Sequence, residues 1–407
     1  MEARSILFVG NFYSPEMLKS IKEDSRGSVS FATHNYEMSL MRGFLSHHNL
    51  DISAITVPTI YSYPRYHKDW YIKGEKYQIE RASIKSVGFI NLPVLKDIWR
   101  SVGLFFSLIQ FFRKRKNDEI KVFLSCPYSY LLTPLFAVKK ILCRRIEVTL
   151  LIMDIPSIVS EMDDNKGLKK WVLSLINRSS MKKVAKCNHL VLMTEAMMDF
   201  VSAEVSHIIV EGIVDVATMS KDYNPLSKCG KEIILYTGTL REIFGVKNLV
   251  DAFELANLDN AELWICGSGD SQEYIEKKAA QNSAIKFFGL VDSKKALELQ
   301  TAATILVNPR TSEGKYTKYS FPSKTMEYLL AGKSVVINRL PGIPEEYLKY
   351  VFTPENESVE ALASLIKQVV DMPFSMRIKK AQLGREFIIS QKNSHIQTSR
   401  IIQLMEL

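Results

Sequence analysis

Strand-length apolar runs alternate with amphipathic stretches along most of the chain, and this alternation restricts the folds that it can adopt. The runs SILFVGNF at residues 5–12 and SVVI at residues 334–337 carry no charge, which is typical of parallel strands buried on both faces. Residues 32–45 and 246–256 instead place apolar side chains at helical spacing. Strands that alternate with helices predict a doubly wound parallel sheet, so the sequence indicates an α/β protein.

The length of the chain and one polar segment predict two domains. A chain of 407 residues exceeds what one hydrophobic core usually supports. The alternation pauses at residues 219–231, a polar stretch with Pro225 and Gly230 that is the best linker candidate. We therefore predict one Rossmann-like domain over residues 1–215 and a second over residues 230–384, followed by a long helical end. The predicted helices include residues 195–201 and 375–407.

Composition and charge narrow the class of protein. Hydrophobic residues make up 46% and charged residues 24%, as in an ordinary globular protein. The five cysteines have no metal-ligand spacing and indicate reduced thiols of a cytoplasmic protein, and the first residues do not predict a signal peptide. A net charge of +9 favours an anionic partner, but no recognition-helix, RNP or zinc-finger pattern is present, so nucleic acid is not expected.

The strongest functional signal is the stretch ILVNPRTSEGKYTKYSFPSKTMEYLLAGKSVVI at residues 305–337. It predicts a strand, a polar loop, a helix that begins near Ser323, and the next strand. A helix N-terminus offers unpaired N–H groups and a positive dipole end, so Ser323 and Lys324 form a seat for a phosphate. Glu327 lies about one turn beyond Lys324, so a cation and a carboxylate face the same ligand. This pair suits a nucleotide sugar.

The motif FPSKTMEYLLAGK resembles the nucleotide-sugar loop and helix of GT4-type retaining glycosyltransferases, which have the GT-B fold. The resemblance implies two doubly wound domains facing each other across a cleft, with a C-terminal helix, residues 385–407, crossing back to the first domain. It also implies that Glu327 binds the ribose hydroxyls. The family has another glutamate eight positions earlier, which meets the donor sugar. Tyr319 occupies that position here, and Glu313 in the same loop is a candidate substitute.

The stretch YTGTLREIFGVKNLVDAF resembles the start of the family's second domain, where a glycine turn, here Gly238, precedes a helix. The family places an arginine and a lysine around this turn to grip the donor diphosphate, whereas this chain has Thr239 and Phe244 at those positions. The remaining candidates for the diphosphate are Arg241, Arg310 and Lys324.

A second glycine turn, Gly267-Ser268-Gly269-Asp270, follows the predicted strand at residues 261–266. The third glycine of a dinucleotide fingerprint is missing, so a Rossmann dehydrogenase is poorly supported. In the family a similar loop lies under the nucleotide base, and Gly267 and Gly269 would let the base approach closely.

Three residues of the first domain are candidates for the acceptor side of the site. Gly27 lies in the loop after the first strand, His34 near the start of the next helix, and Asp154 at the end of a later strand. Each has a plainer alternative, namely a connecting loop, a surface histidine and a helix cap. The tyrosine-rich residues 61–77 offer stacking faces for sugar rings, or form a packed insertion.

The apolar stretch at residues 99–112 is followed at once by four basic residues, 113–116. It is too short to span a bilayer. Two interpretations remain open, a buried helix with a basic end and an interfacial helix that contacts an anionic membrane. The second would place the protein at the inner face of the cell membrane.

The sequence thus predicts a transferase that moves a sugar from a UDP- or GDP-linked donor to a hydroxyl acceptor, such as a lipid-linked or polysaccharide intermediate. Arg310, Lys324 and Glu327 are the predicted catalytic residues, and the resemblance implies retention of configuration. No metal is expected, because cations and a helix N-terminus neutralise the diphosphate. A non-catalytic nucleotide-sugar-binding subunit and a GT-B-type epimerase are the alternatives.

Overall fold

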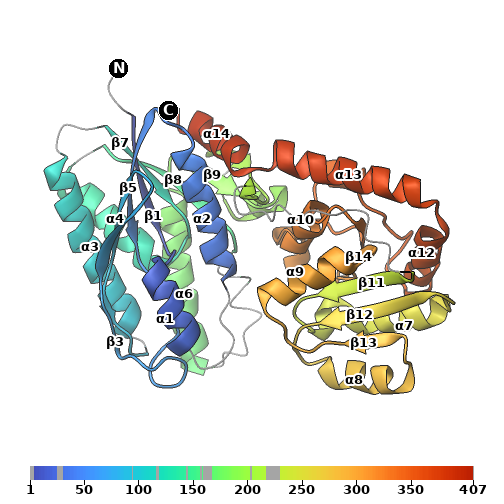
Figure 1. The fold of residues 1–407 in the computed structure, drawn as a ribbon. Coiled ribbons are helices and arrows are strands. Elements are labelled where there is room, and N and C mark those ends of the chain that lie inside the picture. The colour runs from blue at the N-terminus through green and yellow to red at the C-terminus, as the bar shows by residue number, and fades with distance from the viewer. Residues whose placement is uncertain are drawn as a thin grey trace. The chain divides into compact units, whose positions relative to one another are not determined.

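The computed structural model describes residues 4–24, 31–93, 95–115, 119–143, 145–155, 158, 167–201, 204–216 and 230–406. The chain forms two compact units (Figure 1). Unit 1 comprises Met1–Asp215 together with Asn393–Leu407, and unit 2 comprises Val216–Lys392. Each unit is built around its own mainly parallel sheet, so the predicted α/β class is confirmed.

Unit 1 alternates strands and helices from the start of the chain. Its elements are β1 (Arg4–Gly10), α1 (Pro15–Asp24), α2 (Ala32–Leu45), β2 (Leu50–Thr56), β3 (Tyr71–Ile72), β4 (Glu75–Ile79), β5 (Ala82–Ser86), β6 (Phe89–Ile90), α3 (Leu95–Lys114), β7 (Ile120–Leu124), α4 (Ser129–Ile141), β8 (Glu147–Ile152), α6 (Gly167–Val184), β9 (His189–Leu192), η1 (Glu195–Phe200), β10 (Ser206–Ile209) and α14 (Ser394–Leu404).

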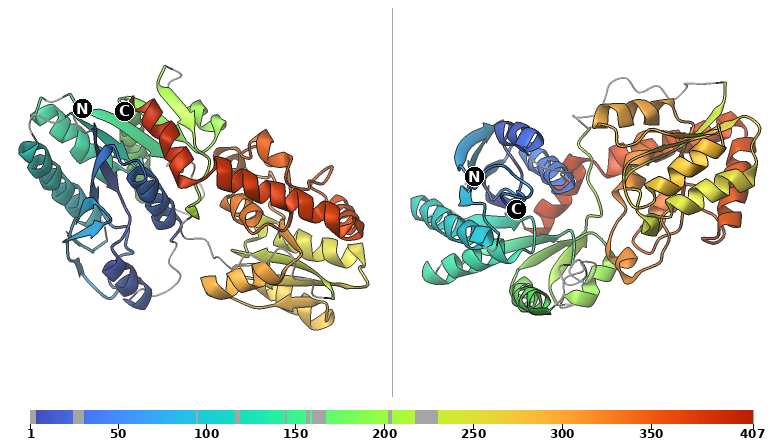
Figure 2. Two further views of the ribbon diagram at one scale, coloured as in Figure 1. Left: turned by 45° about the horizontal axis from the view of Figure 1, so that its top comes forward. Right: turned by 90° about the horizontal axis from the view of Figure 1, so that it is seen from below.

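The eight-stranded sheet of unit 1 has the order β10-β9-β8-β7-β1-β2-β5-β4. All neighbours pair in parallel except β4, which lies antiparallel to β5 at the edge. Along β1, Ile6 and Phe8 pack on one face in a cluster with side chains of α2 and α14, and the alternate residues Leu7 and Val9 are buried on the other. Helix α4 packs against α3 and α6, so these three helices form one layer (Figures 1 and 2).

Unit 2 is a second doubly wound domain with the order β13-β12-β11-β14-β15, all parallel. Its elements are β11 (Glu232–Thr237), η3 (Glu242–Phe244), α7 (Val246–Ala256), β12 (Ala261–Cys266), α8 (Gln272–Gln281), β13 (Ile285–Phe287), α9 (Ser293–Ala302), β14 (Ile305–Asn308), η4 (Lys315–Tyr319), α10 (Ser323–Leu330), β15 (Ser334–Ile337), α11 (Glu345–Leu348), α12 (Val359–Asp371) and α13 (Phe374–Gln391).

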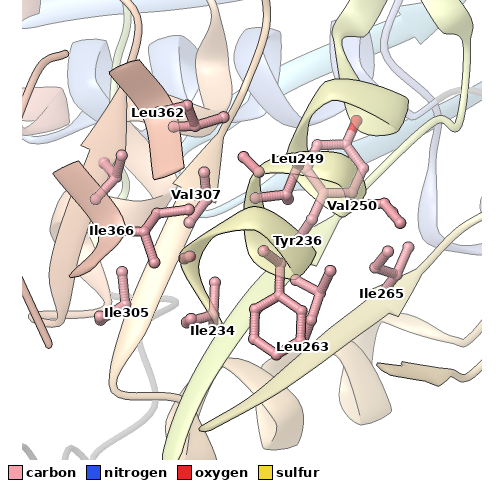
Figure 3. Close-up of a cluster of buried hydrophobic side chains, with 14 of the residues drawn as sticks. Ile234, Tyr236, Leu249, Val250, Leu263, Ile265, Ile305, Val307, Leu362 and Ile366 are labelled. Atoms are coloured by element: carbon pink, nitrogen blue, oxygen red, sulfur yellow. The ribbon is translucent and has the colours of Figure 1, made fainter. Parts of the chain in front are cut away.

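One hydrophobic core of unit 2 lies between the sheet and helices α7 and α12 (Figure 3). Ile234 and Tyr236 of β11 point into this core, where they meet Leu249 and Val250 of α7. Because successive strand residues face opposite sides, Thr237 points to the other face, which carries α9 and α10. Thr237 shares a hydrogen-bonding partner, Gln300, with Glu327 of α10.

Some boundaries differ from the predictions. The single helical end at residues 375–407 is wrong, because α13 stops at Gln391 and α14 begins at Ser394. The side chain of Asn393 caps α14 by accepting a hydrogen bond from the Ile396 N–H, which gives the chain a fresh helix start. As a result, residues 385–392 belong to unit 2, and only residues 393–407 return to unit 1.

Other predicted elements are shorter or tighter than expected. The predicted helix at 195–201 is the 3₁₀ helix η1, and the short strand β10 was not predicted. Helix α1 and the β4–β5 hairpin were not predicted. Most of the predicted linker, namely residues 219–229, lies outside the described residues. Within the described part of the chain, no helix is both long and apolar enough to cross a membrane.

Candidate active site

Helix α10 begins where the sequence predicts it, and it starts at the carboxyl edge of the sheet in unit 2. The chain enters α10 from β14 and leaves it into β15, and these strands are parallel neighbours. A helix between two parallel strands must begin near the carboxyl end of the first, which is the ligand side of such sheets. The first N–H groups of α10, at exposed Ser323 and half-buried Lys324, therefore point toward that edge.

Lys324 and Glu327 lie together on α10, as predicted. Lys324 Nζ is 3.7 Å from Glu327 Oε2, with 27% and 47% of the two side chains exposed, so both groups are accessible to a ligand. Gly238, at the end of β11, makes room for the lysine. A Cβ at Gly238 would lie 2.5 Å from Lys324 Cε, and the φ angle of this residue is +153°. Burial raises the pKa of the neighbouring Cys266 thiol to about 11, and the Lys324 ammonium opposes this rise.

Gln300 fixes the carboxylate of Glu327 and was not predicted. This side chain is buried on α9, where its Nε2 donates hydrogen bonds to Glu327 Oε1 at 2.6 Å and to Thr237 Oγ1 at 3.3 Å. The Tyr328 hydroxyl accepts a hydrogen bond from the Thr237 N–H at 3.0 Å. Residues of β11, α9 and α10 are thereby tied together, and one oxygen of Glu327 is held while the other faces Lys324.

Arg310 occupies the loop after β14, where two aromatic rings hold its guanidinium. Its Cζ lies 4.9 Å from the Tyr316 ring centroid and 5.6 Å from that of Phe244, and Nη2 donates a hydrogen bond to Ser320 Oγ at 3.0 Å. Its Nε is buried and finds no hydrogen-bond partner among the described residues. Burial raises the pKa of the Tyr236 hydroxyl, as does Tyr328, and the Arg310 charge acts against that increase. The Tyr236 hydroxyl and Lys324 Nζ both lie near Gly238, 3.2 and 3.4 Å from the position of a Cβ there.

The predicted glycines Gly238, Gly267 and Gly269 lie in closely packed turns that follow β11 and β12. The Gly238 N–H donates to the Cys266 carbonyl, and a Cβ at Gly267 would lie 1.7 Å from the Gly238 carbonyl oxygen. A Cβ at Gly269 would lie 2.6 Å from the carbonyl group of Leu240. Both glycines allow backbone segments to cross closely. Their contact with a base remains a prediction.

The other donor-side candidates lie in loops and 3₁₀ helices of unit 2. Arg241 is exposed at the start of η3, and Glu313 is exposed in the loop before η4. Tyr319, at the end of η4, is half-buried, with Lys318 Nζ 4.6 Å from its ring centroid. None of these three has a contact with the Lys324–Glu327 pair among the contacts described, so their roles stay predictions.

On the acceptor side, His34 is engaged with a neighbour in unit 1. Its Nδ1 accepts a hydrogen bond from the Tyr13 N–H at 3.2 Å, and the two rings stack with centroids 5.2 Å apart. Asp154 is exposed just after β8. Gly27 lies outside the described residues.

A buried carboxylate in unit 1 escaped the sequence analysis. Glu37 of α2 accepts hydrogen bonds from the Asn11 N–H at 2.6 Å, from Ser125 Oγ at 2.7 Å and from Asn11 Nδ2 at 3.2 Å. Burial raises its pKa, and these donors counteract the rise. The carboxylate connects the segments that follow β1 and β7, at the carboxyl edge of the first sheet. A glutamate within a helical stretch gives no sequence signal for this role.

No metal centre is evident in the parts of the chain that the structure describes, since no three His, Cys, Asp or Glu side chains gather as metal ligands there. Around Lys324 the charged groups are an ammonium and a single carboxylate. This arrangement offers a cation, helix N–H groups and a hydroxyl-binding carboxylate to one ligand.

We expect Gln300→Leu to weaken binding of the nucleotide about tenfold, because a buried hydrogen bond to a charged group contributes on the order of 1.5 kcal/mol. The leucine keeps the volume of the side chain and removes the donor that holds Glu327. Calorimetric titration with the nucleoside diphosphate measures the change. Gln281→Leu, at an exposed position on α8, is the matched control. Equal affinities for both variants would show that Gln300 does not position the site.

Part of the chain matches known glycosyltransferases in sequence. Residues 231–372 match the family model described as glycosyl transferases group 1. An uncharacterized glycosyltransferase of Methanocaldococcus jannaschii is 29% identical over 119 residues, and the match covers 28% of this chain and 29% of the relative. The matched part is therefore less than a third of that relative's length.

Solved structures resemble the whole chain at low sequence identity. Sucrose-phosphate synthase from Thermosynechococcus elongatus has a TM-score of 0.64 at 12% identity, over 99% of both chains. The catalytic domain of starch synthase IV from Arabidopsis thaliana, bound to ADP and acarbose, has a TM-score of 0.68 at 8% identity, also over 99% of both chains. A trehalose-6-phosphate protein from E. coli, bound with UDP-2-fluoro glucose, has a TM-score of 0.66 at 11% identity and the same coverage. The chain thus has the GT-B fold of glycosyltransferases, and its residues 231–372 match the glycosyl transferases group 1 family.

Proposed function

We propose that the chain is a glycosyltransferase that moves a sugar from a nucleotide-diphosphate sugar to a hydroxyl acceptor. The observation that carries this proposal is the Lys324–Glu327 pair at the start of α10, with Gln300 holding the carboxylate. The family match includes all three residues. Structurally similar proteins bound to ADP and to UDP-2-fluoro glucose support a nucleotide-linked donor.

In this proposal Glu327 binds the ribose hydroxyls, and Lys324 with the Ser323 N–H binds the diphosphate. As the glycosidic bond breaks, negative charge grows on the departing phosphate. A fixed ammonium and a helix N-terminus stabilise that charge more in the transition state than in the bound substrate. Arg310, in the loop after β14 of the same unit, is the second candidate cation, since its Nε has an unused donor. The resemblance to retaining enzymes supports retention of the anomeric configuration.

The acceptor side is assigned to unit 1, with His34, Asp154 and the exposed rings of residues 61–71 as candidates. A lipid-linked or polysaccharide intermediate and the cytoplasm are the proposed acceptor and location. UDP or GDP is the proposed carrier, used without a metal. Tyr319 and Thr239, at the positions of the family's sugar-binding glutamate and diphosphate-binding arginine, favour a non-catalytic nucleotide-sugar-binding subunit instead. An epimerase would differ from both by consuming donor without any acceptor.

The test is thermal stabilisation of the protein by UDP-, GDP-, ADP- and CMP-sugars, with and without EDTA. A ligand at about 100 times its dissociation constant contributes about 2.7 kcal/mol to stability, which raises the melting temperature visibly. We expect one diphosphate-linked sugar to stabilise the protein equally in EDTA. Stabilisation that EDTA abolishes would contradict metal-independent binding, and no stabilisation by any sugar would contradict the donor site.

A further inference from the structure

Helix α3 of unit 1 carries an apolar stripe on its exposed side. Ile98, Trp99, Val102 and Phe106 are 57%, 45%, 40% and 65% exposed, although the same helix also buries Leu104 and other apolar side chains against unit 1. With about 100° per residue, residues 98, 99, 102 and 106 fall within roughly 100° of one another around the helix. A contiguous apolar surface of this kind marks an interaction site.

Positive charge continues the stripe at the carboxyl end of α3. Arg113 lies seven residues after Phe106, about two turns further along nearly the same face, and Lys114 follows it, both exposed. The only acidic residue of α3, Asp97, is paired with Arg100. Among the described residues neither Arg113 nor Lys114 forms an ion pair, so the stripe ends in two cations.

Two lysines of the neighbouring hairpin add to this charge. Lys76 of β4 and Lys85 of β5 lie directly opposite each other in the antiparallel pair, an arrangement that is unfavourable without an anionic partner. Lys85 Nζ donates a hydrogen bond to Gln110 Oε1 of α3 at 3.0 Å, which places the pair beside the end of the stripe. Burial lowers the pKa of Lys85, and repulsion from Lys76 and Lys114 lowers it further.

Exposed aromatic side chains also lie at the strand next to the one that packs against α3. The side chains of Trp70 and Tyr71 are 59% and 50% exposed. Tyr71 belongs to β3, which pairs with β6, and β6 packs against α3. Tryptophan and tyrosine concentrate where a protein meets the headgroups of a bilayer, and lysine and arginine bind anionic lipid there. An apolar stripe that ends in basic side chains, as on α3, is typical of an interfacial helix.

We propose that this face of unit 1 docks on a membrane that contains anionic phospholipid, with the stripe in the headgroup region and the cations on lipid phosphates. The inference goes beyond the proposed transfer reaction, because docking requires neither donor nor turnover. It explains why α3 exposes apolar and basic side chains that have no part in the proposed donor site. A lipid-borne acceptor would meet the protein at such a face.

The test is co-sedimentation of the full chain with vesicles of phosphatidylcholine alone and with a quarter of phosphatidylglycerol. We expect binding to the anionic vesicles, weaker at high salt and at least tenfold weaker without phosphatidylglycerol. Arg113→Glu with Lys114→Glu should weaken it by more than tenfold, since each cation near the surface contributes about fivefold. Ile98→Ser with Phe106→Ser should reduce the salt-resistant part by on the order of tenfold.

Matched controls lie in unit 2, where Leu290→Ser and Lys277→Glu change an exposed apolar residue and an exposed cation. Both controls should bind vesicles like the wild type. Stabilisation by the nucleotide sugar reports folding of all variants and should be unchanged, so loss of docking is distinct from loss of the donor site. Absence of wild-type binding, or α3 variants that bind normally, would overturn the proposal. So would light scattering that shows a dimer which Phe106→Ser dissociates, because a second copy would then occupy the stripe.

Discussion

Lys324→Met is expected to lower kcat/KM for sugar transfer about 100-fold, with most of the loss in kcat. Methionine keeps the unbranched stem that lies against Gly238 and removes only the charge. Loss of one preorganised group that stabilises developing charge typically costs on the order of 100-fold to 1000-fold. Because the charge on the phosphate is greater in the transition state than in the ground state, kcat should fall more than the affinity for donor.

Steady-state kinetics with the stabilising donor measure this effect. Lys277→Met, on the exposed side of α8, is the control and should behave as the wild type. Thermal denaturation checks that the Lys324→Met protein is folded. A folded Lys324→Met variant with normal kcat/KM would remove Lys324 from the reaction.

Gly267→Ala is expected to lower the free energy of unfolding of unit 2 by about 4 kcal/mol. The added Cβ would lie 1.7 Å from the Gly238 carbonyl oxygen, and backbone cannot yield as a flexible side chain does. The φ angle of +144° adds strain for any residue with a Cβ. Each of the two effects typically costs about 1 to 3 kcal/mol.

Gly289→Ala separates the two causes. Gly289 also has a positive φ, +66°, but a Cβ there meets nothing within 4 Å, so this variant should lose only about 1 to 2 kcal/mol. Scanning calorimetry compares them, and the transition of unit 2 is the one that the donor shifts. The Gly267→Ala transition should fall by about 10 °C. Equal melting temperatures for the two variants would mean that the close crossing of Gly238 and Gly267 does not constrain the turn.

The sequence alone predicted those features of the site that depend on residues close together in the chain. The strand, loop and helix of residues 305–337 are contiguous, and Lys324 and Glu327 lie one turn apart, so helical periodicity alone placed them on one face. Gln300 is in a different helix, and its contact with Glu327 depends on how α9 and α10 pack on the sheet. Neither periodicity nor composition carries that information.

The sequence also could not show which side of helix α3 is buried. Residues 99–112 are apolar nearly all round, so the pattern left a buried and an interfacial helix open. The fold selects one side, burying Leu104 and Leu108 and exposing Phe106. The break before α14 had a readable local signal, since Asn393 is a favourable helix cap, but the apolar periodicity on both sides of it masked the stop.

The most direct test of the donor site compares the affinities of a nucleoside diphosphate and its parent nucleoside in three proteins. In the wild type the diphosphate should bind far more tightly than the nucleoside. Lys324→Met should erase much of that difference and leave nucleoside binding intact, whereas Glu327→Ala should weaken both ligands by a similar factor, because both contain the ribose. Calorimetric titrations in which both variants bind both ligands as the wild type does would contradict the assignment of Lys324 to the diphosphate and of Glu327 to the ribose.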